Sequence, residues 1–472
     1  MIQRPEAAAK EAPDVAVEVV RSAAADLFVH VFPMVLVDTV RRAHGEDRRQ
    51  FQLVLTDAGS LAPGFIGDDD GLAVLASAWI DLQDEPAVLR LPHTHGRHYE
   101  LNLWDASGGI FACFGSRTAD DAGADIALVG PRWRGQLPSG LRARRAPTDG
   151  VWVVSRTHAH SLLDRPATLA RAHRQCVALL RCERELLHPA VSVLQPPLTS
   201  CLRQAQDISP AELFGRLDGI VGRADPAGQS RFRSRLLELR SKLGGPSEPL
   251  AWSPGFAEAL ERGFADGLSA IRAAAAHARR RTAGWRAVQP GLNEAGLDSL
   301  ARAARAFASL GAPAREDLLT LVCDRDDRGW PLSGVDRYRL HFARDALPPA
   351  NAFWRLSVCA TSATERARGL GDRSDLAPNP DGSLDIFVQH APPAPDQIRN
   401  WLQAPPGEWM LVMRLHNPRP EAFGKAWRMP AVDRVGARPA GGHGSPWRWR
   451  PTFGPQPRLH NPPRPPPEEL SL

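Results

Sequence analysis

The sequence places its best candidate metal ligands in one short segment, PHTHGRHYE at residues 92–100. His93, His95 and Glu100 approximate a His-x-His…Glu spacing, and in a strand the two histidines would lie on one face, close enough to share an ion. The letters HTHG are also typical of a turn, where histidines are usually solvated. No second motif with another His and the right glycines follows to complete a ligand set. The sequence therefore favours a turn, and it predicts neither a bound metal nor another cofactor.

Other reactive groups in the sequence lack the partners that catalysis needs. DRDDRG at 324–329 resembles half of a calcium loop but has no Glu at the twelfth position, so we predict a polar turn. GDDDG at 67–71 has neighbouring carboxylates, which point apart in a turn instead of converging on one bond. Ser155 and Cys359 lie inside apparent strands with no adjacent base. The sequence identifies no catalytic residue and leaves open whether the protein is an enzyme.

Tryptophan is the strongest oddity of the composition, with 13 residues in the chain. We expect most of them to pack in the cores of β domains. A minority is expected to line a pocket, where an indole beside an arginine suits a carboxylate-bearing or sugar-like ligand. The candidate ligand-binding residues are Trp79, Asp81, Arg97, Trp104, Arg117, Trp354 and Arg373.

The charge distribution argues against nucleic-acid binding. The chain has a formal net charge of +5, with 24% charged and 43% hydrophobic residues. Much of the excess positive charge falls in the last segment, 436–472, where proline is too dense for a packed core. A nucleic-acid domain would gather that charge on one folded face. We therefore predict no nucleic-acid partner.

The sequence also predicts a soluble, cytoplasmic protein without a membrane partner. Its N-terminal residues, MIQRPEAAAKEAPD, are too polar for a signal peptide. The longest apolar run, Leu27–Val37, is interrupted by His30 and Pro33 and is too short to span a bilayer. The six cysteines form no CxxC pair, which favours reduced thiols over a disulfide framework.

Periodicity divides the chain into alternating helical and strand-rich regions. A helix is predicted from Val15 to about His44, with Pro33 bending or dividing it. Six strand-like runs separated by turn residues follow over 50–160, which favours an antiparallel sandwich or barrel. Apolar residues at spacings of three and four then predict about five helices, starting with ATLARAHRQCVALLRCERELL at 167–187. One of them should begin at Ser209-Pro210, with Ser as its cap.

From Leu319 the pattern returns to strands, and Asp336–Val435 alternates apolar and polar residues between turn residues. The predicted fold class is therefore α+β and multidomain. The predicted segments are a disordered 1–14, a helix with a β-sandwich over 15–160, a helical domain over 161–320, a β-sandwich over 321–435 and a disordered tail rich in Pro and Arg over 436–472.

Two blocks of this sequence resemble the paired bacterial domains of unknown function numbered 1254 and 1214. The first block includes FPMVLVDTVRR (32–42) and SAWIDLQDEPAVLRLPHTHGRHYELNLWDA (77–106). The second includes LPPANAFWRLSV (347–358), NPDGSLDIFVQH (379–390) and NWLQAPPGEWMLVMRL (400–415). The resemblance implies an immunoglobulin-like sandwich, a helical middle and a jelly-roll-like sandwich, in that order.

The chain departs from the family pattern where a polar run usually precedes the Ala-Trp pair. Here the run is DDDGLAVLAS at 68–77, with Leu72 and Leu75 at the carboxylate and aromatic positions. TSATERARGL at 361–370 likewise lacks the usual Tyr. If those positions line a ligand site in the family, this chain has altered or lost it.

Two functional hypotheses follow from these observations. The first is a binding or structural protein with a small-molecule ligand between its sandwiches, or with self-association into a homo-oligomer. The second is a hydrolase or metal-dependent enzyme whose residues converge from distant segments where the two sandwiches meet.

Overall fold

In the computed structural model of this chain, the described residues up to Val435 belong to one compact unit. The predicted disordered ends, apart from Asp14 and Gly436, lie outside the described residues, as do GDDDG at 67–71 and both His93 and His95. The described residues are 14–43, 52–57, 73–91, 97–118, 125–159, 179–181, 184–187, 190–192, 198–224, 231–243, 252–277, 281–282, 284–287, 297–360, 368–424 and 426–436.

The predicted N-terminal helix is α1, Asp14–Ala43. Pro33 lies inside it, and the helix continues to Ala43. Arg41 and Arg42 lie in its last turn, where positive charge interacts favourably with the negative end of the helix dipole. Every residue from Leu27 to Val40 is buried. A helix that is apolar on all sides is stable only when other elements surround it, so α1 forms the centre of a core.

By length and composition alone, Val17–Ala43 is long and apolar enough to cross a membrane. This contrasts with the sequence-based expectation, which considered only the shorter run Leu27–Val37. In the structure, 89% of its most apolar stretch is buried. Such burial is typical of a helix at the centre of a core.

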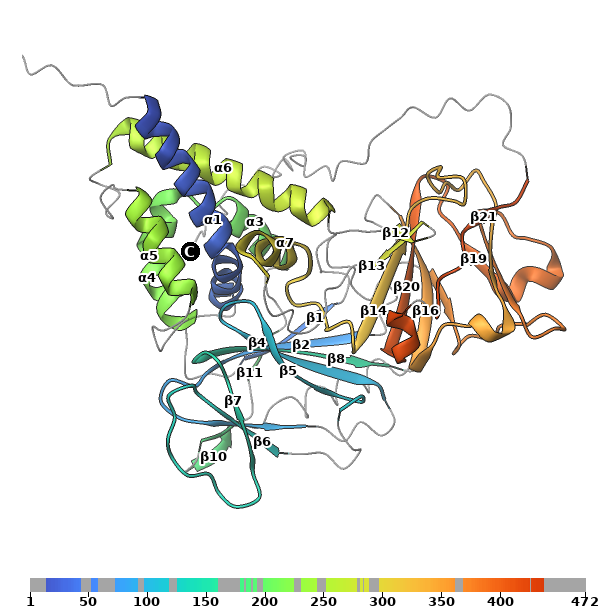
Figure 1. Ribbon diagram of the computed structural model, residues 1–472. Helices are drawn as coiled ribbons and strands as arrows, with labels where there is room; N and C mark the ends of the chain where they lie inside the picture. The colour runs from blue at the N-terminus through green and yellow to red at the C-terminus, as the bar shows by residue number, and fades with distance from the viewer. Residues whose placement is uncertain are drawn as a thin grey trace, which may run out of the picture. The chain divides into compact units, whose positions relative to one another are not determined.

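The other helices surround α1 and share its core (Figure 1). They are α3 (Leu198–Gln206), α4 (Pro210–Ala224), α5 (Arg231–Leu243), α6 (Pro254–His277) and α7 (Ser299–Ser309). Helix α4 begins at Pro210 as predicted, and the Ser209 hydroxyl accepts a hydrogen bond from the Glu212 N–H. The predicted helix over 167–187 is wrong where the structure describes it, because 179–181 and 184–187 pair as two short strands, β9 and β10.

Apart from β9 and β10, the described N-terminal strands form two sheets that pack face to face. The larger has the order β11 (Ala190–Ser192), β1 (Gln52–Asp57), β2 (Ala73–Asp81), β8 (Gly150–His158), β4 (Tyr99–Asp105) and β5 (Ile110–Gly115). The smaller contains β3 (Ala87–Arg90), β6 (Asp125–Val129) and β7 (Arg142–Arg145). Leu103 and Val153 of the larger sheet and Leu89 and Leu128 of the smaller lie in one core between them.

The opposite face of the larger sheet packs against the helices. Trp104, Trp152 and Val154 alternate with the sandwich residues and join the core around α1. Covered on both faces, β8 is buried along its whole length. Polar side chains at the ends of β4 and β8 therefore need partners inside the protein.

The C-terminal strands form two further sheets. A six-stranded sheet has the order β12 (Arg281–Thr282), β13 (Trp285–Ala287), β14 (Leu318–Cys323), β20 (Trp409–Pro418), β16 (Ala350–Ala360) and β17 (Arg368–Gly371). A four-stranded sheet has the order β19 (Trp401–Gln403), β18 (Leu384–Gln389), β15 (Tyr338–Phe342) and β21 (Asp433–Arg434). Short 3-10 turns lie at Arg344–Ala346, Pro395–Asn400 and Pro420–Phe423.

Strand β20 shows how the C-terminal sheet separates two environments. Leu411, Met413 and Leu415 lie in the core shared by the C-terminal sheets. Because side chains alternate along a strand, Arg414 and His416 lie on the other face, and both are only 1% exposed. A buried polar surface thus covers the outer face of this sheet.

The close approach of α6 to α1 gives a first prediction. A Cβ added at Gly263 would lie 2.4 Å from the Arg21 carbonyl oxygen and 2.6 Å from the Ala24 Cβ. Gly263→Ala should therefore force the helices apart and destabilise the protein by about 1–3 kcal/mol in urea unfolding. Gly215 in α4 is the matched control, because nothing lies within 4 Å of its added Cβ. Gly215→Ala should stabilise by about 0.5–1 kcal/mol; the same sign for both variants would contradict this packing.

Near the end of α1, the buried carboxylate of Asp38 binds several arginines. It accepts hydrogen bonds of 2.7–3.1 Å from four guanidinium groups, those of Arg41, Arg42, Arg216 and Arg223. Burial raises the pKa of Asp38, but the hydrogen bond from Arg216 and the surrounding positive charges outweigh it and hold the pKa below its usual range. The carboxylate therefore ties α4 to α1.

Asp38→Asn should leave four guanidinium groups around a neutral amide. We expect a loss of about 3–5 kcal/mol in the free energy of unfolding, measured in urea, because breaking a buried ion pair leaves charge uncompensated. Asp218→Asn removes a carboxylate that is 87% exposed and paired with Arg240, so its effect should be close to zero. Equal effects of the two substitutions would show that the Asp38 cluster does not stabilise the fold.

Candidate metal centre

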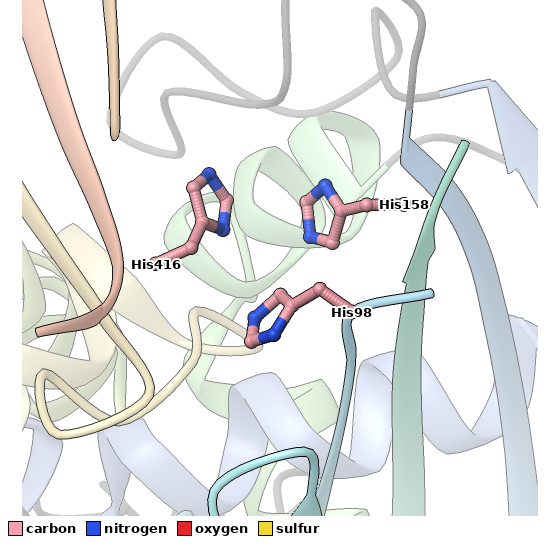
Figure 2. Close-up of side chains that lie close together, drawn as sticks. All are labelled: His98, His158 and His416. Carbon is pink, nitrogen blue, oxygen red and sulfur yellow. The ribbon is translucent and has the colours of Figure 1, made fainter. Parts of the chain in front are cut away.

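Three buried histidines from separate segments of the chain converge on one point (Figure 2). They are His98, His158 and His416, and one ring nitrogen of each lies within 4.8 Å of the others. All three side chains are at most 4% exposed. Among the described residues, this is the one group of three or more potential metal ligands that lie close enough together to share an ion.

Strand pairing brings the first two histidines together. Tyr99 of β4 lies opposite Thr157 of β8, so His98 and His158 are the next pair along the ladder. The His158 N–H donates a hydrogen bond to the His98 carbonyl oxygen at 2.9 Å. Residues directly opposite each other in an antiparallel pair place their side chains on the same face. The ring centroids are accordingly 5.4 Å apart.

The third histidine comes from the C-terminal sheet. His416 lies on β20 between Leu318 of β14 and Phe353 of β16. Its ring stacks on that of Phe353, with centroids 4.0 Å apart and planes 16° apart. Its centroid lies 4.5 Å from that of His158 and 5.5 Å from that of His98. The cluster therefore joins the N-terminal and C-terminal sheets.

Burial keeps His98 and His416 neutral. Desolvation lowers the pKa of His98 to about 3, and the nearby His158 and Arg373 lower it further. The pKa of His416 also lies well below its usual value, mainly because the side chain is buried. A neutral imidazole keeps the nitrogen lone pair that binds a metal ion.

The ring nitrogens of His98 lack hydrogen-bond partners. Within the described residues, neither Nδ1 nor Nε2 of His98 has one, and the same holds for Nδ1 of His416. An unsatisfied buried polar group costs about 1–3 kcal/mol. A metal ion would satisfy one nitrogen of each ring, and nitrogens at 2.0–2.1 Å from a tetrahedral ion lie about 3.4 Å apart. Small ring rotations toward the centre would provide that geometry.

Charged and polar groups continue this buried layer. Glu100 lies two residues after His98 on the same face of β4, with Arg156 opposite it on β8. Arg156 forms a 4.0 Å ion pair with Glu100 and donates a 2.6 Å hydrogen bond to the Gly311 carbonyl oxygen. From the C-terminal sheet, Arg414 lies two residues before His416 and is equally buried. The histidines thus belong to a polar layer in the interior.

The tryptophans proposed from sequence as ligand-binding residues lie in cores. Trp79 and Trp104 belong to the core that the large N-terminal sheet shares with the helices. Trp354 is buried between the C-terminal sheets, 6.2 Å from the Phe342 ring. The structure does not bring these three residues together with the histidine cluster.

The charged candidates lie in different surroundings. Asp81 is exposed at the end of β2 and accepts a hydrogen bond from the Gln83 N–H. Arg117 forms a 2.6 Å hydrogen bond with Asp317. Arg97 directly precedes His98 in the sequence. Arg373 lies beside the cluster. Its guanidinium carbon is 3.9 Å from the centroid of the Phe353 ring, which stacks on His416.

Sequence reasoning missed two of the three clustered histidines. Neither His158, which opens the short run HAH at 158–160, nor His416, which lies near the end of an apolar strand, was singled out from the sequence. His98 lies in the segment that was considered for its metal ligands, but through His93, His95 and Glu100. Of these only Glu100 is described, and it faces Arg156. The signal available in the sequence was a histidine at the end of an apolar, strand-like run.

The remaining sequence motifs have structural partners. Asp326 of DRDDRG accepts hydrogen bonds from the backbone N–H groups of Arg328 and Trp330 and pairs with buried Arg434 at 2.8 Å. These hydrogen bonds and this ion pair therefore hold the segment as a polar turn. Ser155 lies within the buried strand β8, and Cys359 lies within β16.

Comparison with known families identifies both strand-rich regions. Residues 73–179 match the family described as DUF1254, and residues 317–420 match the protein of unknown function DUF1214. The chain contains a DUF1254 region followed by a DUF1214 region. This confirms the resemblance inferred from sequence. His98 and His158 lie in the DUF1254 region and His416 in the DUF1214 region, so the cluster is divided between the two.

One solved structure shares this fold at low sequence identity. The VPA0106 protein from Vibrio parahaemolyticus is 16% identical, with a TM-score of 0.59, covering 89% of this chain and 100% of that one. An uncharacterized protein from Burkholderia cenocepacia is 14% identical, with a TM-score of 0.40, covering 86% and 87% of the two chains. No curated protein matches the chain significantly. At these identities the similarity concerns the fold alone.

The buried neutral histidines predict a pH dependence of stability. The pKa of His98 is about 3 in the folded protein, below its usual 6.5. The unfolded chain therefore binds more protons, and stability is lost as the pH falls from 6.5 toward 3. The loss from this one residue approaches about 1.4 kcal/mol per pH unit.

Urea unfolding between pH 6 and pH 5, with chelator present, measures this slope before most carboxylates titrate. His98→Phe should remove the contribution of His98 to this change of unfolding free energy with pH, whatever its effect on absolute stability. An equal slope in His98→Phe and the unmodified protein would contradict the neutral state of His98.

Proposed function

We propose that this protein binds a divalent transition-metal ion through His98, His158 and His416, and that the ion acts on a small ligand. The observation that carries the proposal is the convergence of three buried imidazoles from three separate segments of the chain, with nitrogens within 4.8 Å of one another. The unsatisfied nitrogens of His98 support it, because a metal ion would remove the cost of burying them. The proposal departs from the sequence-based expectation of no metal, which rested on different residues.

The ligand set indicates the type of ion and its role. Imidazole ligands suit Zn, Fe, Ni and Cu ions better than Ca or Mg ions, which prefer oxygen. Three protein ligands leave at least one coordination position open, as in catalytic zinc sites. Such an ion supplies Lewis acidity to a bound oxygen or lowers the pKa of a bound water. The protein's contribution is to hold the three rings and to surround them with a buried layer.

Of the two functional hypotheses drawn from sequence, the geometry favours the metal-dependent one. Hydrolysis is the reaction class that the sequence-based alternative named, and it agrees with Lewis-acid chemistry. Binding of a small ligand is part of the same proposal. Self-association, a cytoplasmic location and the lack of nucleic-acid and membrane partners stay predictions, as do the immunoglobulin-like and jelly-roll-like topologies of the two sandwiches.

The proposal predicts one bound metal ion per chain. Metal-free protein titrated with Co²⁺ or Zn²⁺ should bind one equivalent and become more stable to heat, because the ion binds only the folded state. At a free metal concentration of 100 Kd the gain is about 2.7 kcal/mol. Elemental analysis gives the stoichiometry, and Co²⁺ absorption reports the coordination.

Variants at the cluster separate this site from other histidines. His416→Asn should abolish high-affinity binding while keeping a polar side chain of similar size. His341→Gln is the matched control, since His341 is exposed on β15 and hydrogen-bonds to Asp385. Protein that takes up no metal, or takes up equal amounts with and without His416, would overturn the proposal.

A further inference from the structure

Arg373 forms a layered contact with the histidine cluster. Its guanidinium carbon lies 3.9 Å from the centroid of the Phe353 ring. Phe353 in turn stacks on His416, at 4.0 Å between centroids. The same phenyl ring lies 5.8 Å from the ring of His98 and 5.5 Å from that of His158. Phe353 thus contacts all three histidines and holds the arginine beside them.

The charge of Arg373 has no carboxylate bound to it in the part of the chain that the structure describes. The neighbouring Asp372 accepts a hydrogen bond from the Trp354 N–H at 3.3 Å, and its negative charge acts on Arg373 through space. Other arginines of this region are paired, Arg156 with Glu100 and Arg117 with Asp317. Arg373 also remains exposed, in contrast to the buried histidines. It is therefore placed to meet a group that arrives from solvent.

The field of Arg373 reaches the proposed metal ligands. Its positive charge contributes to lowering the pKa of both His98 and His416. Arg414 acts on His416 in the same direction. A divalent ion at the cluster would add further positive charge. A ligand that binds there gains electrostatic free energy if it is an anion.

We propose that Arg373 binds the carboxylate of a small organic acid whose second oxygen group lies on the metal ion at His98, His158 and His416. The inference rests on the proposed metal site and names its ligand class. A guanidinium matches a carboxylate with two parallel hydrogen bonds. Because the Phe353 ring separates the guanidinium from His416, the charged group and the metal-bound oxygen belong to different parts of the ligand. Hydroxy acids, oxo acids and half-esters of dicarboxylic acids have this form.

The experiment uses the full chain loaded with Co²⁺ and follows its visible absorption. Loading is measured first, in the unmodified protein and in each variant. Malate, its uncharged dimethyl ester, acetate and inorganic phosphate are then titrated separately. Malate should change the Co²⁺ spectrum at lower concentration than acetate, which lacks the second oxygen group, and than the dimethyl ester, which lacks the charge. Tighter binding of phosphate than of malate would overturn the assignment to a carboxylate.

Substitution of Arg373 isolates its contribution. Arg373→Gln should weaken malate binding tenfold or more, because a hydrogen bond to a charged group contributes about 1.5–3 kcal/mol. Arg373→Lys keeps the positive charge but lacks the two parallel N–H donors of the guanidinium, so it should retain part of the affinity. Arg419→Gln, at an exposed arginine directly after β20, should bind malate like the unmodified protein. Arg373→Lys and Arg419→Gln should both load as much Co²⁺ as the unmodified protein.

The outcomes separate the two proposals. If Co²⁺ does not bind, the proposed metal site fails and this inference fails with it. If Co²⁺ binds but malate does not change its spectrum, or if Arg373→Gln binds malate as tightly as the unmodified protein, only the ligand assignment is overturned. Normal Co²⁺ loading of Arg373→Gln shows that the cluster is intact, so a loss of malate binding in that variant is attributed to the missing guanidinium.

Discussion

The structure depends on the burial of α1. This helix is apolar on all sides and needs cover along most of its length, which the other helices and one face of the large N-terminal sheet supply. The same sheet uses its other face for the sandwich core. Its central strands are therefore shielded from water on both faces, and the polar residues at their ends, including His98 and His158, lie in the interior.

Much of this architecture could be predicted from local sequence. Period-two alternation located β4, β6, β15 and β18, and in β18 buried residues alternate with half-buried ones. Segment 179–187 was misread because its leucines also fit a helical period, and strand pairing overrode that local preference. Strand β7, with the sequence RARR, is exposed throughout and has no apolar signal at all. Its strand conformation comes from parallel pairing with β6.

The candidate site was much less predictable than the fold. Its three histidines come from two sheets, and only the register between β4 and β8 and the outward face of β20 bring them together. Neither relation is encoded near the residues concerned. The tryptophans suggested for a pocket instead fill cores, as the size of their side chains favours. Arg373 was identified from sequence, whereas its stacking on Phe353 depends on the folded sheet.

The division of the histidines between two regions has a consequence for biosynthesis. Chains are made from the N-terminus and begin to fold as they emerge. His98 and His158 are therefore synthesised and paired long before His416 exists. Two imidazoles alone form an incomplete ligand set, so the nascent DUF1254 region is protected from premature metal capture. At the proposed metal site, the third ligand, His416, would be added only when the DUF1214 region has been made.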